Sequence, residues 1–383
     1  MQSDQTAVWR FRDAADRSSG GLQTRRLCPT LADHQRKAAA LPEPLKFALA
    51  IRGQFAAGYD MAKALEELLA QCRLARQLGF AGIAKSQHYS SAPFQEIQQL
   101  PFLARAAAEV PGLDIITGIS LLPLHKPLDL AEQLAALDLI SGGKLIYGCG
   151  IGYREVEFNA FGTTQSERVS RFVENLDAIR RLWREPSVTM TGSHFTLDRA
   201  SCSVKPLQPG GPPVWIGADA DAAIRRAARL GDAWMINPHV RVDTLIRQMD
   251  IYKQALDKNG KQFPKIQPLI REMYVASSRA EAMRRARPYL EAKYKAYHAW
   301  GQDDDMPDGD NDLSAAYEDM ARDRFIFGGF DEAAEQLATV ARACGANYLL
   351  APIQWPGMPQ SEALEQMHVL MEEVKPRVEA ALR

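Results

Sequence analysis

Residues 141–162 read SGGKLIYGCGIGYREVEFNAFG and combine a helix end, a strand and a glycine-rich loop. The glycine pair at positions 142 and 143 is typical of a left-handed helix end. The apolar run 145–149 has the length of a strand. Gly148, Gly150 and Gly152 then let the backbone approach a ligand closely, because no Cβ stands in the way. The GxGxxG fingerprint is absent, so the spacing alone equally fits an ordinary strand-to-loop turn.

The composition sets the class of protein. The chain has 383 residues, 46% of them hydrophobic, and a net charge near -1, which suits one large domain or two ordinary ones. This charge balance gives no reason to expect nucleic acid or a membrane surface as a partner. Five scattered cysteines without a CxxC pair indicate neither a disulfide framework nor a zinc knuckle, and favour the cytoplasm.

Strand-like and helix-like patterns alternate along most of the chain. Each strand-like run is followed by a helical stripe; after the first run the stripe covers residues 62–78 and is closed by Gly79. Eight such units with parallel strands predict a (β/α)8 TIM barrel with insertions. The alternative is an open doubly wound sheet, which should show two halves joined by a linker. The eight runs are residues 45–51, 80–84, 114–120, 144–149, 214–217, 233–236, 267–277 and 347–351.

Three segments depart from this alternation. Residues 187–197 predict a hairpin around a Gly-Ser turn. Residues 298–324 are polar and acidic, which indicates a solvated loop or a lid and argues against a strongly anionic substrate. Residues 1–44 mix arginines with aspartates and lack apolar periodicity, so we expect a flexible N-terminal extension before a single barrel domain over residues 45–383.

In a barrel, functional residues lie where strands end and loops begin. That rule selects His88 with Gln87 after the second strand, and His239 after the sixth. A lone histidine is often only a hydrogen-bonded polar group, yet its position makes His88 the catalytic candidate. The sequence has no HExxH, GxSxG or P-loop motif, so neither a protein metal site nor a common hydrolytic route is indicated. An enzyme whose cofactor supplies the reactivity fits these features.

A second candidate site is the turn at Gly217-Ala218-Asp219-Ala220, where a strand runs directly into a helix. Backbone amides exposed at a helix start can hold a phosphate. Alternatively, Asp219 or Asp221 is simply the N-cap of that helix. An aspartate beside a phosphate would be repulsive, so we expect contact through the backbone.

Four blocks of sequence resemble the bacterial luciferase-like flavin monooxygenase family, from residue 45 to the end of the chain. They are residues 119–162, 214–235 (VWIGADADAAIRRAARLGDAWM), 327–337 (FGGFDEAAEQL) and 347–359 (NYLLAPIQWPGMP). The resemblance implies a (β/α)8 barrel with an insertion and a mobile loop after the seventh strand. It also implies binding of reduced FMN, usually delivered by a separate reductase, or of a deazaflavin coenzyme.

The same resemblance implies roles for individual residues. His88 matches a histidine near the flavin reaction centre. Gly118 and Ile119 match the segment that supports the flavin ring, and we include the adjacent Ser120. The positions that match segments reaching the ribityl phosphate are Gly150, Gly152, Tyr153, Arg154, Gly217, Ala218, Asp219 and Ala220.

This chain departs from the family pattern in three places. Gln87-His88-Tyr89 stands where the family has EHH, and Lys144 replaces the arginine of a GGR run. Ile151 stands where luciferases carry an arginine near the phosphate. We therefore expect Arg154 to substitute for that arginine.

Three functions follow from the resemblance. In a two-component monooxygenase, reduced FMN reacts with oxygen to give a C4a-peroxyflavin that oxygenates a small organic substrate, with His88 as acid, base or hydrogen-bond partner. Its partners would be molecular oxygen and a flavin reductase, and we expect a homo-oligomer. The alternatives are a deazaflavin-dependent oxidoreductase that transfers hydride, and a flavin-binding protein without turnover.

Overall fold

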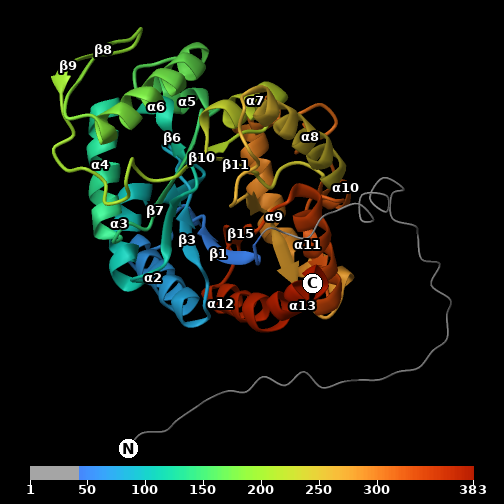
Figure 1. The fold of residues 1–383 in the computed structure, drawn as a ribbon. Coiled ribbons are helices and arrows are strands. Elements are labelled where there is room, and N and C mark those ends of the chain that lie inside the picture. The colour runs from blue at the N-terminus through green and yellow to red at the C-terminus, as the bar shows by residue number, and fades with distance from the viewer. Residues whose placement is uncertain (1–42) are drawn as a thin grey trace, which may run out of the picture.

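The barrel is built from eight parallel strands that close into a ring (Figure 1). The computed structural model describes residues 43–383. Around the ring each strand neighbours the next one in the sequence, β15 pairs with β1, and a bridge between Ile236 and Leu269 joins β11 to β12. The strands are β1 (Lys46–Ile51), β3 (Gly82–Lys85), β5 (Asp114–Thr117), β7 (Leu145–Gly150), β10 (Val214–Gly217), β11 (Ala233–Met235), β12 (Pro268–Ile270) and β15 (Tyr348–Pro352).

Helices cover the outside of the ring (Figure 1). Because side chains alternate across a strand, Phe47 and Leu49 of β1 pack outward in the cluster that includes helix residues, while Ala48 faces the barrel interior. The helices are α2 (Met61–Gln77), α3 (Gln99–Glu109), α4 (Pro127–Ile140), α5 (Glu155–Ala160), α6 (Arg168–Arg184), α7 (Asp221–Leu230), α8 (Val242–Lys258), α9 (Arg279–Ala299), α10 (Tyr317–Ala321), α11 (Phe330–Cys344), α12 (Gln360–His368) and α13 (Lys375–Leu382).

The expected (β/α)8 barrel is confirmed, and the open sheet is wrong because the first and last strands pair. Each of the eight predicted runs overlaps one barrel strand. The seventh run, residues 267–277, divides in two: after β12 the chain leaves the ring, and β13 (Met273–Val275) pairs with β14 (Ile326–Gly328). The break falls at Arg271 and Glu272, whose side chains are buried in polar contacts of their own.

The insertions lie at the ends of the barrel strands. β8 (Val188–Thr191) and β9 (Thr196–Ala200) form the predicted hairpin, and β2 (Gln54–Ala56) with β4 (Phe94–Glu96) forms a second, unpredicted antiparallel pair. The acidic segment 298–324 contains the 3-10 turn η3 (Gln302–Asp305) and α10. It is not wholly solvated, because Asp310 is buried against Arg324 with 3.3 Å between Oδ1 and Nη2.

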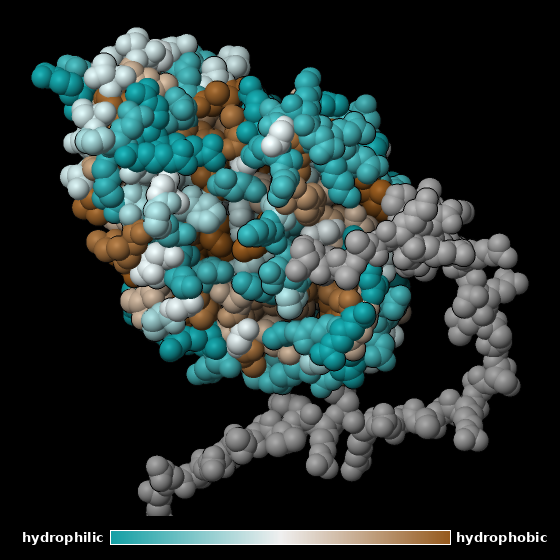
Figure 2. Space-filling model, in the orientation of Figure 1, coloured by the Kyte–Doolittle hydropathy of each residue, from teal (hydrophilic) through white to brown (hydrophobic). Residues whose placement is uncertain are grey.

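The surface gives no sign of a single broad apolar face on the side drawn in Figure 2, where hydrophilic residues predominate and hydrophobic patches are scattered. Among residues 43–383, no helix combines the length and the apolar character needed to cross a membrane. The predicted extension, residues 1–44, lies almost entirely outside the described residues.

Candidate active site

A cavity opens at the carboxyl ends of the barrel strands, where loops from several strands meet. Its wall brings together predicted residues that are more than 100 positions apart in the sequence. Those that line it are His88, Gly118, Ile119, Gly152, Tyr153, Gly217, Ala218, Asp219 and Ala220, together with Gln87 and His239. Ser120, Gly150 and Arg154 do not line this cavity. The barrel rule thus selects residues that line one cavity, while three of the assigned residues lie outside its lining.

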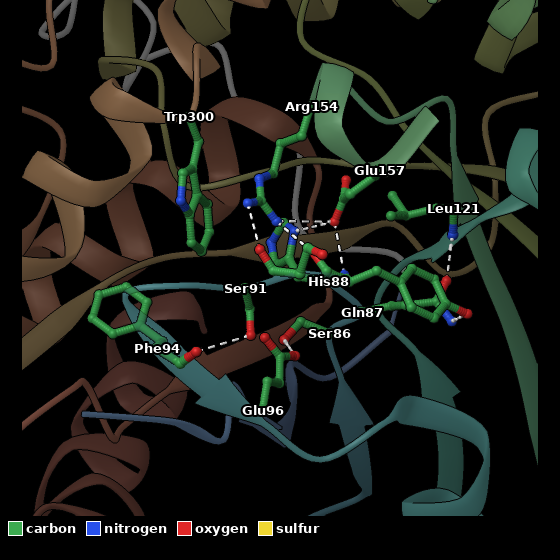
Figure 3. Close-up of polar contacts among 12 residues, drawn as sticks. Ser86, Gln87, His88, Ser91, Phe94, Glu96, Leu121, Arg154, Glu157 and Trp300 are labelled. Carbon is green, nitrogen blue, oxygen red and sulfur yellow. Dashed lines mark hydrogen bonds and ion pairs between the residues drawn. The ribbon is translucent and has the colours of Figure 1, made fainter. Parts of the chain in front are cut away.

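His88 lies in a ring of polar and aromatic groups (Figure 3). Its Nδ1 is 3.4 Å from Oε1 of Glu157, a carboxylate that is 1% exposed. The same oxygen accepts hydrogen bonds from the backbone N–H of Tyr89 at 2.8 Å and from Arg154 Nη1 at 3.2 Å. The indole of Trp300 lies 5.2 Å from the imidazole, centroid to centroid. Glu157 thus fixes one side of the His88 ring.

Arg154 is held within the protein. Its guanidinium donates to the carbonyl oxygens of Tyr89 and Ser90 at 2.7 and 2.9 Å, pairs with Glu157, and stacks over the Trp300 ring at 4.0 Å (Figure 3). The side chain is 4% exposed. The expectation that Arg154 contacts a phosphate does not fit this geometry well, because both Nη atoms already donate to the loop that carries His88.

The segment after β5 approaches β7 so closely that side chains on β7 would collide with it. A Cβ on Gly148 would lie 1.9 Å from the Thr117 carbonyl oxygen, and one on Gly150 would lie 2.0 Å from Cδ1 of Ile119. These glycines make room for the protein's own chain, and the cofactor contact expected for Gly150 stays a prediction. The Gly118–Ile119 peptide bond is cis.

Ser120 also serves the protein's interior. It is fully buried, and its hydroxyl donates to Oε1 of Gln99 at 2.6 Å. Gln87 has a comparable function at the end of β3, where its Oε1 accepts from the Leu121 N–H at 2.8 Å. Side-chain amides and hydroxyls therefore tie the strand ends together, and in this segment Gly118 and Ile119 line the cavity.

The loop after β7 and the turn after β10 face each other across one end of the cavity. Gly152 adopts φ +74°, a conformation that glycine tolerates. The Tyr153 hydroxyl and Asp219 Oδ1 are buried and have no hydrogen-bond partner within the described residues. Ala220 is the N-cap of α7 without any side-chain bond, so the first amides of that helix have no side-chain acceptor. The N-cap alternative for Asp219 and Asp221 is wrong, since Asp221 pairs instead with Arg247 at 2.7 Å.

Charges at this end are arranged around two aspartates. Burial, followed by the nearby charge of Asp305, raises the pKa of Asp219 to about 7. Asp305 itself is held by Arg168 through two hydrogen bonds of 2.9 and 2.7 Å, and Arg168 also donates to the Gly152 carbonyl. Near neutral pH, Asp219 therefore alternates between a charged and a neutral form.

Several residues that line the cavity were not predicted from the sequence. Arg52 directly follows β1, so the strand-end rule applied to the first strand would have found it. Tyr297, Gln302 and Asp305 come from the segment between β13 and β14, and no periodic signal in that polar stretch indicates which residues reach the cavity. His239 was anticipated; its Nδ1 lies 3.3 Å from the Tyr294 hydroxyl, and burial lowers its pKa well below the ordinary value.

The fold and this cavity define a TIM-barrel protein with a ligand site at the carboxyl ends of its strands. The family model described as luciferase-like monooxygenase matches residues 45–347, so the chain belongs to this family. That confirms the resemblance inferred from the sequence. Members of the family include monooxygenases and F420-dependent dehydrogenases.

Three relatives illustrate this range. The F420-dependent glucose-6-phosphate dehydrogenase of Nakamurella multipartita is 28% identical over 218 residues, 54% of this chain and 62% of the relative. The monooxygenase RslO1 of Streptomyces bottropensis superimposes with a TM-score of 0.76 and 24% identity over 87% of this chain and 99% of the other. The oxygenating constituent of 3,6-diketocamphane monooxygenase of Pseudomonas putida, solved with FMN, superimposes with a TM-score of 0.69 and 16% identity. The superposition covers 88% of this chain and 99% of the other. At these identities the two structures show the fold alone.

The chain spans about three fifths of the length of the first curated relatives it matches, 59% and 62%. Family membership is therefore shown, while the activity, cofactor and substrate of this chain have to be inferred from its own residues.

Proposed function

We propose that the chain is a reduced-FMN-dependent monooxygenase that oxygenates a small organic substrate, with reduced flavin supplied by a separate reductase. The observation that carries the proposal is the convergence of four strand ends on one cavity. His88 comes from the end of β3, Gly118 and Ile119 from β5, Gly152 and Tyr153 from β7, and the turn at 217–220 from β10.

The polar groups at the β10 side fit the ribityl phosphate of FMN. The Tyr153 hydroxyl and the first amides of α7 are hydrogen-bond donors that lack a side-chain partner in the described residues. A helix start favours an anion through its aligned amides. The Asp219 carboxylate would repel a phosphate, and protonation removes this repulsion, since burial raises the pKa of Asp219 to about 7. We infer that these groups hold the phosphate chain, and that Gly118 and Ile119 support the ring.

Reduced FMN, when bound, supplies electrons and activates molecular oxygen. The protein then has to exclude water and place a proton. Trp300, which donates from Nε1 to the Ala92 carbonyl at 2.9 Å, stands over the His88 loop and shields it. With the Nδ1 proton directed at Glu157, His88 Nε2 carries a lone pair that accepts a proton, and the imidazolium formed in this way can then deliver that proton.

A second candidate is an F420-dependent oxidoreductase that transfers hydride. The curated relative that is 28% identical is F420-dependent, which favours this candidate at the level of sequence. Both functions use the same cavity and the same histidine. They differ in the cofactor bound and in the response to oxygen.

Binding and oxygen consumption separate these functions. FMN and F420 are titrated into the protein without oxygen, and reduced FMN is then supplied in air while oxygen consumption and hydrogen peroxide are recorded. We expect FMN to bind and its reaction with oxygen to differ in rate from that of free reduced FMN. Exclusive binding of F420 would replace the proposal with the second candidate, and bound FMN with an unchanged oxygen reaction would indicate a flavin-binding protein without turnover.

A further inference from the structure

Arg52 forms the cavity wall at the carboxyl end of β1. Its side chain is 14% exposed. Nη2 donates to Oε1 of Glu272 at 3.0 Å, and Nη1 lies 3.4 Å from the Tyr297 hydroxyl. The guanidinium therefore borders the cavity while one edge is anchored to a carboxylate behind it.

The carboxylate behind Arg52 serves more than one cation. Glu272 is fully buried and also accepts from Lys293 Nζ and from the Trp355 indole N–H. Lys85 and Glu96 form a neighbouring ion pair, with 2.6 Å between Nζ and Oε1. Their side chains are 0% and 1% exposed. Three basic side chains at this end of the barrel, Arg52, Lys85 and Lys293, thus have two carboxylates between them, and Glu272 serves both Arg52 and Lys293.

A second group of buried side chains also contains more basic than acidic groups. Arg271 and Arg324 are both almost fully buried, and the acid beside them is Asp310, paired with Arg324 at 3.3 Å. His239 lies among these groups and cannot balance them, because burial and the charges of Lys293 and Arg52 lower its pKa and keep it neutral. Buried positive charge at this end therefore exceeds buried negative charge.

Unbalanced buried charge is unfavourable unless a partner or a lost proton relieves it. Loss of a proton from Lys293 reduces the positive charge in part, since burial and the neighbouring Arg52 lower the pKa of Lys293 to about 7. The other form of relief is an anion in the cavity against Arg52. The surrounding wall contains Ile119, Met235 and Ile270, so such an anion would be attached to an apolar body.

We propose that the substrate of this cavity is a small organic acid, an apolar molecule with one carboxylate that binds Arg52. This inference rests on the proposed function, in which the cavity holds both flavin and substrate. The flavin phosphate does not compete for Arg52, because β10 stands four strands from β1 in either direction around the ring of eight. The acidic segment 298–324 does not oppose it either, since Asp305 and Asp310 are paired with Arg168 and Arg324.

The test compares two pairs of probes that differ in charge, benzoate with benzamide and formate with formamide. Dissociation constants are measured by calorimetry on the full chain, without flavin and with oxidised FMN. Variants are Arg52→Met, which removes the charge, Arg52→Lys, which keeps it, and Arg247→Met as a control at a half-exposed ion pair. We expect benzoate to bind more tightly than benzamide, and Arg52→Met to weaken benzoate by about 10–100-fold, the range for a hydrogen bond to a charged group. Arg52→Lys should retain most of the preference, and benzamide should be unaffected.

Equal binding of acid and amide in both pairs would overturn the inference, as would an unchanged benzoate affinity in folded Arg52→Met. Should Arg52→Met weaken FMN and leave benzoate unchanged, the charge serves the flavin and the inference is wrong. If Arg52→Met does not fold, the inference is tested by the ratio of benzoate to benzamide affinity in the wild-type protein. The change of this ratio in Arg52→Lys is the second test. Failure of the proposed function is a separate result, namely no binding of FMN, because the probe experiment without flavin does not depend on it.

Discussion

The two ends of the cavity differ in charge and in the kind of group they offer. The β10 end, formed by Gly152, Tyr153 and the 217–220 turn, offers backbone amides and an aspartate whose pKa is about 7. The β1 end, formed by Arg52 and the ion pairs behind it, offers an arginine whose carboxylate partner, Glu272, is shared with Lys293. His88 follows β3, beside β1. This difference supports our proposals that a cofactor phosphate binds at the β10 end and that the substrate contacts the β1 end.

The largest effect is expected from His88→Ala. The variant removes the imidazole that the loop after β3 contributes to the cavity, while the β10 end stays intact. We expect turnover to fall by about 10²–10⁴, the usual range for a positioned acid or base, and FMN affinity to change little. Hydrogen peroxide released per oxygen consumed should rise. His368→Ala, at a half-exposed helix position, is the matched control. Normal turnover and coupling in His88→Ala would make His88 a structural residue and direct attention to His239 or Tyr89.

A smaller effect is expected from Glu157→Gln. The amide preserves the shape of the side chain and its acceptor for the Tyr89 N–H, and removes the charge that faces His88 and Arg154. We expect kcat to fall by about 10–10², because a modest displacement of a catalytic group has costs of that order. FMN affinity should stay constant. The control is Glu155→Gln on the exposed side of the same helix. A parallel loss of FMN binding would mean that Glu157 supports the fold of the loop and does not position His88 specifically.

The smallest effect concerns pH and the β10 end. Below pH 7 Asp219 is neutral, and above it the carboxylate is charged and repels a phosphate. Affinity for FMN should therefore fall by about tenfold between pH 6 and pH 8, the limit for one proton with a pKa near 7. Asp219→Asn should remove this dependence, and riboflavin, which has no phosphate, should not show it. A similar pH dependence for riboflavin, or for the Asn variant, would place the titrating group elsewhere.

The sequence predicted the barrel well because each strand and helix has a local period. The eight runs, the helix ending at Gly79 and the mouth position of His88 all follow from patterns a few residues long. Predictions about polar partners were poorer. Ser120 and Arg154 were assigned to the cofactor, and their actual acceptors are Gln99, the Tyr89 and Ser90 carbonyls and Glu157.

The buried basic groups at the β1 end could not be predicted from the sequence for a related reason. Arg52 and Glu272 are 220 positions apart and meet only because the ring closes. Local periodicity indicates which side of a strand is buried, and it carries no information on which distant group will neutralise a buried charge. The segment between β13 and β14 is a similar case, since Tyr297 and Asp305 reach the cavity from a stretch without periodic signal.

A crystal structure with FMN tests the polarity of the cavity most directly. The account predicts the phosphate against the turn at 217–220 and the start of α7, with the ring on Gly118 and Ile119 and within reach of His88. It also predicts that Arg52 remains free of the phosphate. A phosphate bound to Arg52, with the ring turned toward the β10 end, would contradict the account.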